Sequence, residues 1–150
     1  MTEPTHSEVW TTWRDLIGNF MMEFSEIEYI SFSLWRGIFS NENPSHNFKK
    51  RTKRVISQLN GSDNIEIRKN LERAIDIADK RNTIAHNPTL MQIFINEETN
   101  QIYRELAIST FSEGNYIDLP EIKELTAEAR DIKVQLYMKL GYLPQENKNA

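Results

Sequence analysis

Hydrophobic residues recur at alternating intervals of three and four along residues 8–39 of this chain, with one interruption at Ser31. This spacing predicts one long amphipathic helix, and Thr5 followed by Glu8 is typical of the capping box that begins a helix. The apolar face either packs on neighbouring helices or forms a dimer seam, and the spacing allows both. The positions that carry the pattern are Trp10, Trp13, Ile17, Phe20, Phe24, Ile27, Leu34 and Ile38.

A second, shorter helix is expected over residues 48–59, after a turn-rich segment at 41–47 and before an Asn-Gly pair that ends it. Asp63 then offers an N-terminal cap for a third amphipathic helix. A proline disfavours helical geometry in the residue before it. Because Pro88 has this effect, the third helix should end at about His86.

The region between the third and last helices predicts a β-hairpin. Residues 90–108 are rich in β-branched and aromatic residues on both sides of a polar turn at 96–100. A last helix should start at Pro120, which two acids flank, and end at Gly141. The fold class expected is therefore all-α, a bundle of about four helices with a β-hairpin insertion between the third and last helices.

The composition narrows the classes of function. A length of 150 residues suits a single domain over residues 1–150, with flexible tails at 1–7 and 144–150. The chain has no cysteine, and its three histidines lack metal-ligand spacing, so we expect no metal and no other cofactor. No apolar run approaches the roughly 18 residues of a membrane span, and no signal peptide is recognisable, so the cytoplasm is the default location. A net charge of −4 argues against non-specific binding of nucleic acid over the whole surface.

The end of the third helix carries three polar residues in an unusual position. At about 100° per residue, Asn82 lies near the centre of the apolar stripe, His86 lies on it and Arg81 lies at its edge. Unsatisfied polar groups cost roughly 1–3 kcal/mol when buried, so these side chains need partners or a function. A proton-transferring histidine beside a permanently charged guanidinium suits phosphodiester chemistry. The alternative is an ordinary polar helix end, with Arg81 paired to a local acid such as Asp79 or Glu105.

This stretch, Arg81-Asn82-Thr83-Ile84-Ala85-His86, resembles the Rx4–6H motif of the HEPN superfamily (higher eukaryotes and prokaryotes nucleotide-binding domains). The Asn after the Arg and the Ala before the His match the form common in many members, and the expected architecture of residues 8–140 is also similar. The resemblance implies a helical bundle that dimerises, so that two copies of the motif face one another across a cleft. In active members this cleft forms a metal-independent endoribonuclease.

In this family, Arg81 and His86 would be the catalytic pair, and Asn82 would position or contact them. The implied reaction is attack of the RNA 2′-hydroxyl on the adjacent phosphate, which leaves a 2′,3′-cyclic phosphate or a 3′-phosphate. Some members place an acid on the first helix that reaches the motif, and Glu28 is the candidate here. Superfamily toxins paired with a nucleotidyltransferase antitoxin often carry a Tyr two residues after the His. This chain has Pro88 there, which puts that mode of control in doubt.

The partners implied by the resemblance are a second copy of the chain, RNA such as tRNA or mRNA, and an antitoxin or sensor protein. These are the partners of a toxin or a phage-defence effector. The alternative is a non-catalytic HEPN-like module that binds RNA, a nucleotide or a protein. A plain helical dimerisation domain is a further alternative.

Several other residues carry weaker signals. The aromatic residues Trp10, Trp13, Trp35 and Tyr29 either stack on bases or belong to the core, which their spacing favours. His6 and His46 fall in terminal or loop segments and receive no role. Positive charge concentrates on the second helix, where it forms either an RNA-backbone track or an ordinary solvated face. The residues of this basic segment are Lys49, Lys50, Arg51, Lys53 and Arg54.

Overall fold

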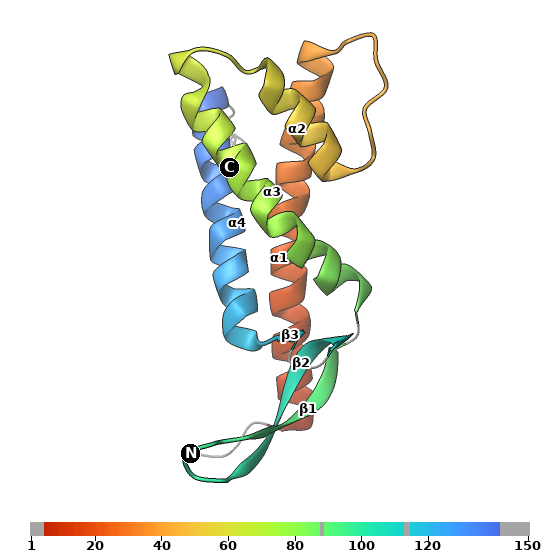
Figure 1. The fold of residues 1–150 in the computed structure, drawn as a ribbon, viewed down its shortest axis with the longest axis vertical. Helices are drawn as coiled ribbons and strands as arrows, with labels where there is room; N and C mark the ends of the chain where they lie inside the picture. The colour runs from red at the N-terminus through yellow and green to blue at the C-terminus, as the bar shows by residue number, and fades with distance from the viewer. Residues whose placement is uncertain (1–4, 88, 113–114, 142–150) are drawn as a thin grey trace, which may run out of the picture.

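The computed structural model describes residues 5–87, 89–112 and 115–141. These residues form a mostly helical fold with a small antiparallel sheet between the third and last helices (Figure 1). The expectation of an all-α fold is therefore only roughly met, whereas the expected hairpin insertion is present. The elements are α1 (His6–Ile38), α2 (Phe48–Gln58), the short 3-10 turn η1 (Ser62–Asn64), α3 (Ile65–His86), β1 (Thr89–Ile95), β2 (Ile102–Ser112), β3 (Asn115–Ile117) and α4 (Leu119–Leu140).

Capping residues mark the start of α1 and both ends of α4. Thr5 Oγ1 accepts a hydrogen bond from the backbone N–H of Glu8, and Glu8 Oε2 accepts one from the backbone N–H of Thr5, which confirms the capping box of α1. Asp118 caps α4 by accepting a hydrogen bond from the backbone N–H of Glu121. Gly141 ends α4 with a φ of 74°, a left-handed conformation that glycine adopts without strain.

Two local expectations were wrong. Asp63 does not cap α3, because η1 precedes that helix and Asn64 takes the cap position without a side-chain hydrogen bond. Residues 5–7 do not belong to a flexible tail, since they form the cap and the first turn of α1. The rest of the expected tails, residues 1–4 and 144–150, lies outside the described residues.

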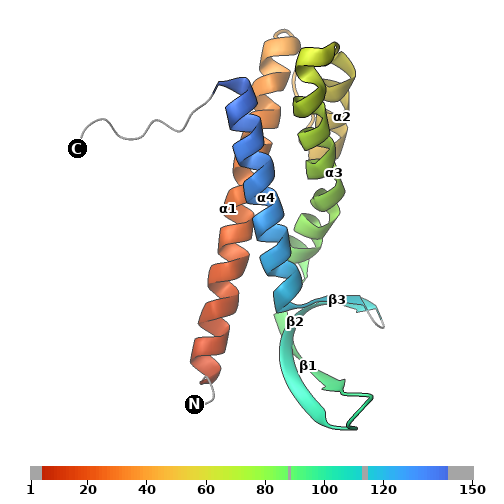
Figure 2. The same cartoon turned by 90° about the vertical axis from the view of Figure 1, so that its left-hand side faces the viewer.

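Polar contacts between helices show how the bundle is arranged. Glu23 on α1 pairs with Lys133 on α4, and Glu26, one turn further along α1, accepts a hydrogen bond from Tyr137. Because these contacts advance in the same direction along both helices, α1 and α4 run parallel. Figure 2 shows that α3 runs in the opposite direction, with α2 at the same end of the bundle as the start of α3.

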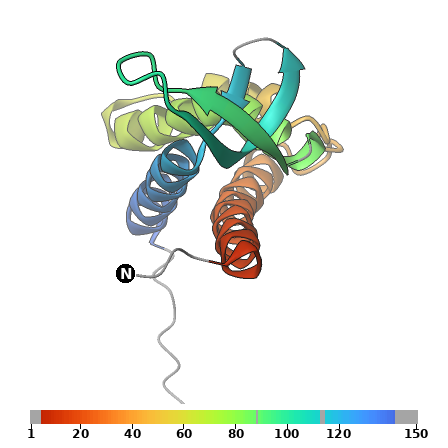
Figure 3. The same ribbon diagram turned by 90° about the horizontal axis from the view of Figure 1, so that it is seen from below.

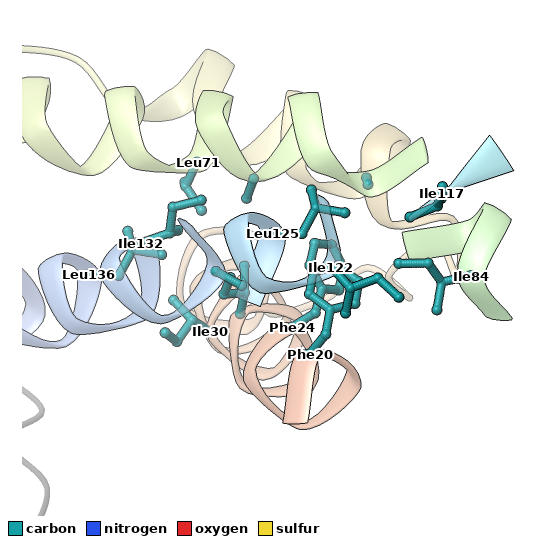
Figure 4. Close-up of a cluster of buried hydrophobic side chains, with 14 of the residues drawn as sticks. Phe20, Phe24, Ile30, Leu71, Ile84, Ile117, Ile122, Leu125, Ile132 and Leu136 are labelled. Atoms are coloured by element: carbon teal, nitrogen blue, oxygen red, sulfur yellow. The ribbon is translucent and has the colours of Figure 1, made fainter. Parts of the chain in front are cut away.

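One buried hydrophobic cluster joins α1, α3 and α4, with contributions from α2 and the sheet (Figure 4). Phe20 and Leu71 are fully buried members of this cluster, and burial of one such side chain stabilises the fold by roughly 1.5–3 kcal/mol. Trp13 and Trp35 are 2% and 3% exposed and belong to this core. They are therefore not available to stack on bases, whereas Tyr29 is 65% exposed.

A three-stranded antiparallel sheet lies across one end of the bundle (Figure 3). The expected hairpin is confirmed, because β1 pairs with β2 from Thr89 opposite Ile108 to Ile95 opposite Ile102. The third strand, β3, was not expected, since three residues are too few to show an alternating pattern. Its Ile117 is 1% exposed and joins the core, so the sheet closes the end of the bundle at which α3 stops.

Candidate functional site

The third helix, α3, ends at the last residue of the motif. Asn87 leaves helical geometry, with φ −118° and ψ 146°, so His86 is the last residue of the helix, as predicted. The backbone N–H and the side-chain Nδ2 of Asn87 both donate to the carbonyl of Thr83, at 3.1 and 2.8 Å. These bonds satisfy a carbonyl in the last turn and fix the backbone that carries His86.

The motif side chains spread around α3 and do not share one covered face. Ile84 is 5% exposed and lies in the core, on the side of α3 toward Ile117 (Figure 4), whereas Asn82 and His86 are exposed and Arg81 is half-buried. The expectation of a covered Asn82 and His86 is therefore wrong within one chain. The physical reason is that the sheet meets the last turns of α3 on the side of Ile84. The spacing of apolar residues on α3 also allows a second subunit to cover this face.

Arg81 contacts two side chains that the sequence singled out. Its Nη2 lies 3.4 Å from Oε1 of Glu28 on α1, and its Nη1 donates to Oδ1 of Asn82 at 3.2 Å. The side chains of Arg81 and Glu28 are each 28% exposed, so this ion pair is partly shielded from water. The contact expected of Glu28 is thus present. The alternative pairing of Arg81 with Asp79 is not, because Asp79 contacts α2 instead.

A hollow of about 310 Å³ lies beside this ion pair, where α1, α3 and the start of α2 meet. Lys49 reaches it from α2 and donates to both carboxylate oxygens of Asp79, at 3.1 and 3.2 Å. His46, to which the sequence assigned no role, belongs to its wall, whereas His86 does not. The ionisable side chains that line this hollow are Glu28, His46, Lys49, Asp79 and Arg81.

Arg51 is not on an exposed RNA-binding face, contrary to expectation. It is 1% exposed, and its guanidinium lies 3.6 Å from the centroid of the Phe32 ring. Its Nε donates to Oγ of Ser31 at 3.1 Å and its Nη1 donates to the carbonyl of Ser45 at 2.7 Å. Burial lowers the pKa of Arg51, and the negative charge of Glu28 offsets part of this effect. Three residues beyond the start of α2, Arg51 falls on the buried stripe of that helix, so helical spacing could have identified it.

The remaining cations of the basic segment stay at the surface. Lys50 and Lys53 are exposed, and Arg54 forms an exposed ion pair of 2.7 Å with Glu42. Lys49 is engaged in the same way with Asp79. Ion pairs of this kind contribute little to stability, so these four side chains remain able to contact an RNA backbone.

No protein-family model matches the chain, and no significantly similar curated protein or solved structure was found. Within the described residues, no group of three or more His, Cys, Asp or Glu side chains is placed to hold a metal ion. No helix in that part of the chain is long and apolar enough to cross a membrane. The function is therefore inferred from the geometry around Arg81.

Proposed function

We propose that the chain is a metal-independent endoribonuclease of the HEPN type. The observation that carries this proposal is the anchored guanidinium of Arg81, which Glu28 and Asn82 contact near the end of α3. A guanidinium held in advance stabilises charge that develops on a phosphate without reorganising during the reaction. The biological role that fits is a toxin or phage-defence effector that cleaves tRNA or mRNA under the control of an antitoxin or sensor protein.

The proposed reaction is attack of an RNA 2′-hydroxyl oxygen on the adjacent phosphorus. The O2′–P bond forms, the P–O5′ bond breaks, and the products end in a 2′,3′-cyclic phosphate and a 5′-hydroxyl. One imidazole takes the proton of the 2′-hydroxyl, and an imidazolium gives a proton to the departing 5′ oxygen. His86 of one chain supplies one of these groups, and His86 of a second copy supplies the other. Arg81 stabilises the charge on the phosphoryl oxygens.

A second copy of the chain is required because Arg81 and His86 leave α3 in different directions. Five steps along an α-helix separate two side chains by about 140° around the axis. One chain therefore does not bring the two groups onto the same phosphate. In a two-fold dimer, the exposed His86 of one chain approaches the Arg81 of its partner, because the same surface patch contributes from both sides.

The test is cleavage of RNA by the purified chain in excess EDTA, with identification of the product ends. Wild type should cut RNA and leave 2′,3′-cyclic phosphates. Arg81→Ala and His86→Ala should each lower the rate by about 10²–10⁴-fold. The matched variants Arg14→Ala and His6→Ala change exposed residues near the start of α1 and should cut at the wild-type rate. RNA that stays intact with a stoichiometric dose of wild type would exclude the enzyme.

Mixing wild type with His86→Ala tests whether the site is shared between chains. The proposed reaction uses His86 of both chains, so a heterodimer of wild type with His86→Ala lacks one of the two proton-transfer groups. In a 1:1 mixture with free subunit exchange, about half of the wild-type chains pair with the variant, and the activity per wild-type chain should therefore fall by about half. Unchanged activity after demonstrated exchange would exclude a shared site, as would a wild-type chain that is monomeric at micromolar concentration.

A non-catalytic HEPN-like module is the second candidate, and the position of His86 favours it. His86 does not line the hollow that contains Arg81, so one chain offers a polar binding surface without the histidine of the motif. Such a module binds RNA, a nucleotide or a protein partner and leaves RNA intact. RNA that binds to wild type without being cut, and that binds less tightly to Arg81→Ala, would identify this function.

A further inference from the structure

We propose that the hollow beside Arg81 is a subsite for one phosphate group of a bound RNA strand, held by His46, Lys49 and Arg81 of the same chain. The proposal rests on the proposed function in that RNA is taken as the ligand. It goes beyond that function because it places a second histidine, outside the motif, in contact with the substrate. His46 and Lys49 both line the hollow together with Arg81.

Contacts on both sides of His46, which is itself exposed, fix the backbone of the loop that places it in the wall of the hollow. The carbonyl of Ser45 accepts a hydrogen bond from the buried Arg51 at 2.7 Å, and Oγ of Ser45 accepts one from the backbone N–H of Asn47 at 3.2 Å. Asn47 also caps α2 by accepting from the backbone N–H of Lys50 at 3.0 Å. The loop that carries His46 is therefore tied to a buried cation at one flank and to a helix start at the other.

The side chains that converge on the hollow are rich in hydrogen-bond donors. The imidazole of His46 donates at least one N–H in either protonation state, the ammonium of Lys49 offers three donors and the guanidinium of Arg81 offers five. They come from three separate segments, namely the loop before α2, α2 itself and α3. A phosphate presents several acceptor oxygens in a small volume, and the guanidinium fork matches their spacing.

The size of the hollow also suits a phosphate and its sugar. Its volume of about 310 Å³ is near the lower limit of sites for small molecules, which span roughly 300–1,000 Å³. The rings of Phe24 and Phe48 lie 5.1 Å apart between their centroids and form the apolar part of the lining. Because Phe24 is 1% exposed, a ligand in the hollow contacts mainly the polar groups of its lining.

In the free protein, Lys49 is paired with Asp79 and Arg81 with Glu28, and a ligand displaces one of these carboxylates more easily than the other. The side chain of Asp79 is 72% exposed, so its ion pair with Lys49 is weak and screened by salt. Lys49 can therefore exchange Asp79 for a phosphate oxygen. Glu28 is more shielded and stays with Arg81, whose five donors exceed the two contacts made to Glu28 and Asn82.

The experiment uses the full chain and a 2′-O-methyl RNA trinucleotide, which the proposed reaction cannot cut because its attacking hydroxyl is blocked. The imidazole NMR signals of the histidines report contact independently of activity. The His46 signals should shift on titration, and the His6 signals should not.

His46→Ala and Lys49→Ala should each raise the Kd by about 5–20-fold. Lys49→Ala should also reduce the slope of log K against log salt by about 1. His6→Ala and Lys139→Ala, which alter exposed residues on other surfaces, should keep the wild-type Kd.

A second titration, with ATP in place of the trinucleotide, distinguishes an RNA subsite from a pocket for free nucleotides. The subsite is overturned if ATP shifts the His46 signals and the trinucleotide does not, or if wild type fails to bind the trinucleotide. It is also overturned if His46→Ala and Lys49→Ala both keep the wild-type Kd. In that last case, cleavage of unmodified RNA by wild type would leave the proposed nuclease standing. Conversely, wild type that binds the trinucleotide through His46 but does not cut unmodified RNA would support the subsite and refute the nuclease.

Discussion

Replacing Arg51 with methionine should destabilise the fold, although the sequence suggested a surface role for this residue in RNA binding. The guanidinium donates to the hydroxyl of Ser31 and to the carbonyl of Ser45, and it stacks 3.6 Å from the centroid of the Phe32 ring. Methionine keeps an apolar stem of similar length. It removes all three contacts, however, and leaves the carbonyl of Ser45 without its donor.

The magnitude of the loss follows from these contacts. A hydrogen bond from a charged donor contributes roughly 1.5–3 kcal/mol, and a desolvated cation–π contact contributes about 2 kcal/mol. Burial of a guanidinium costs several kcal/mol, which the neutral side chain recovers. The free energy of unfolding should therefore fall by about 2–4 kcal/mol in total. With a slope of roughly 2 kcal/mol per molar urea, the unfolding midpoint should fall by about 1–2 M.

Equilibrium unfolding in urea, followed by circular dichroism at constant pH, measures this change. Lys53→Met is the matched control, because it removes an exposed cation from the same helix and should change stability by no more than about 0.5 kcal/mol. Equal midpoints for Arg51→Met and Lys53→Met would refute the structural role of Arg51. Arg51 would then belong to the exposed basic face of α2.

Three other changes test the rest of the bundle. Burial raises the pKa of Glu23, but hydrogen bonds from Lys133 and a neighbouring arginine outweigh this effect and hold that pKa below its ordinary value. The stabilisation of the fold by this pair is therefore present above the ordinary carboxyl pKa and is lost as the pH falls through the lower pKa of the folded state. Lys133→Met should reduce that loss, measured by urea unfolding between neutral and acidic pH. An unchanged pH dependence would contradict the pairing. Leu71→Ala, at a fully buried position, should lower the free energy of unfolding by about 2–5 kcal/mol. Leu90→Ala, at a 40% exposed position, should lower it much less. Equal decreases for the two variants would argue against the core described. Asp118→Ala removes the cap of α4 and should cost about 0.5–2 kcal/mol by thermal unfolding, and no change in Tm would show that the cap is dispensable.

The features that the sequence predicted correctly depend on residues close together in the chain. The start of α1 depends on Thr5 and Glu8, which are three residues apart. The end of α3 at His86 depends on the proline at position 88, and the start of α4 depends on Asp118. Each of these signals acts through one turn of backbone, so no knowledge of tertiary contacts was needed.

The features that the sequence missed depend on distant contacts. The charge of Arg51 predicts a surface position although its helical spacing places it on the buried stripe of α2, and only the fold shows that the ring of Phe32 and the carbonyl of Ser45 are its partners. The apolar stripe of α3, continued along the helix, predicts a covered Asn82, but the sheet meets that helix on the side of Ile84. His46 carries no local signal, since only the tertiary fold brings its loop beside Arg81.

The charge of the hollow bears on how it distinguishes RNA from other polyanions. The charges of Lys49 and Arg81 balance those of Glu28 and Asp79 within its lining, so these four side chains leave no excess of positive charge. A phosphate is therefore not drawn in by a strong field, and its affinity must come from short hydrogen bonds that depend on geometry. This agrees with a chain whose net charge is −4. Such a site selects its ligand by the positions of the donors on His46, Lys49 and Arg81.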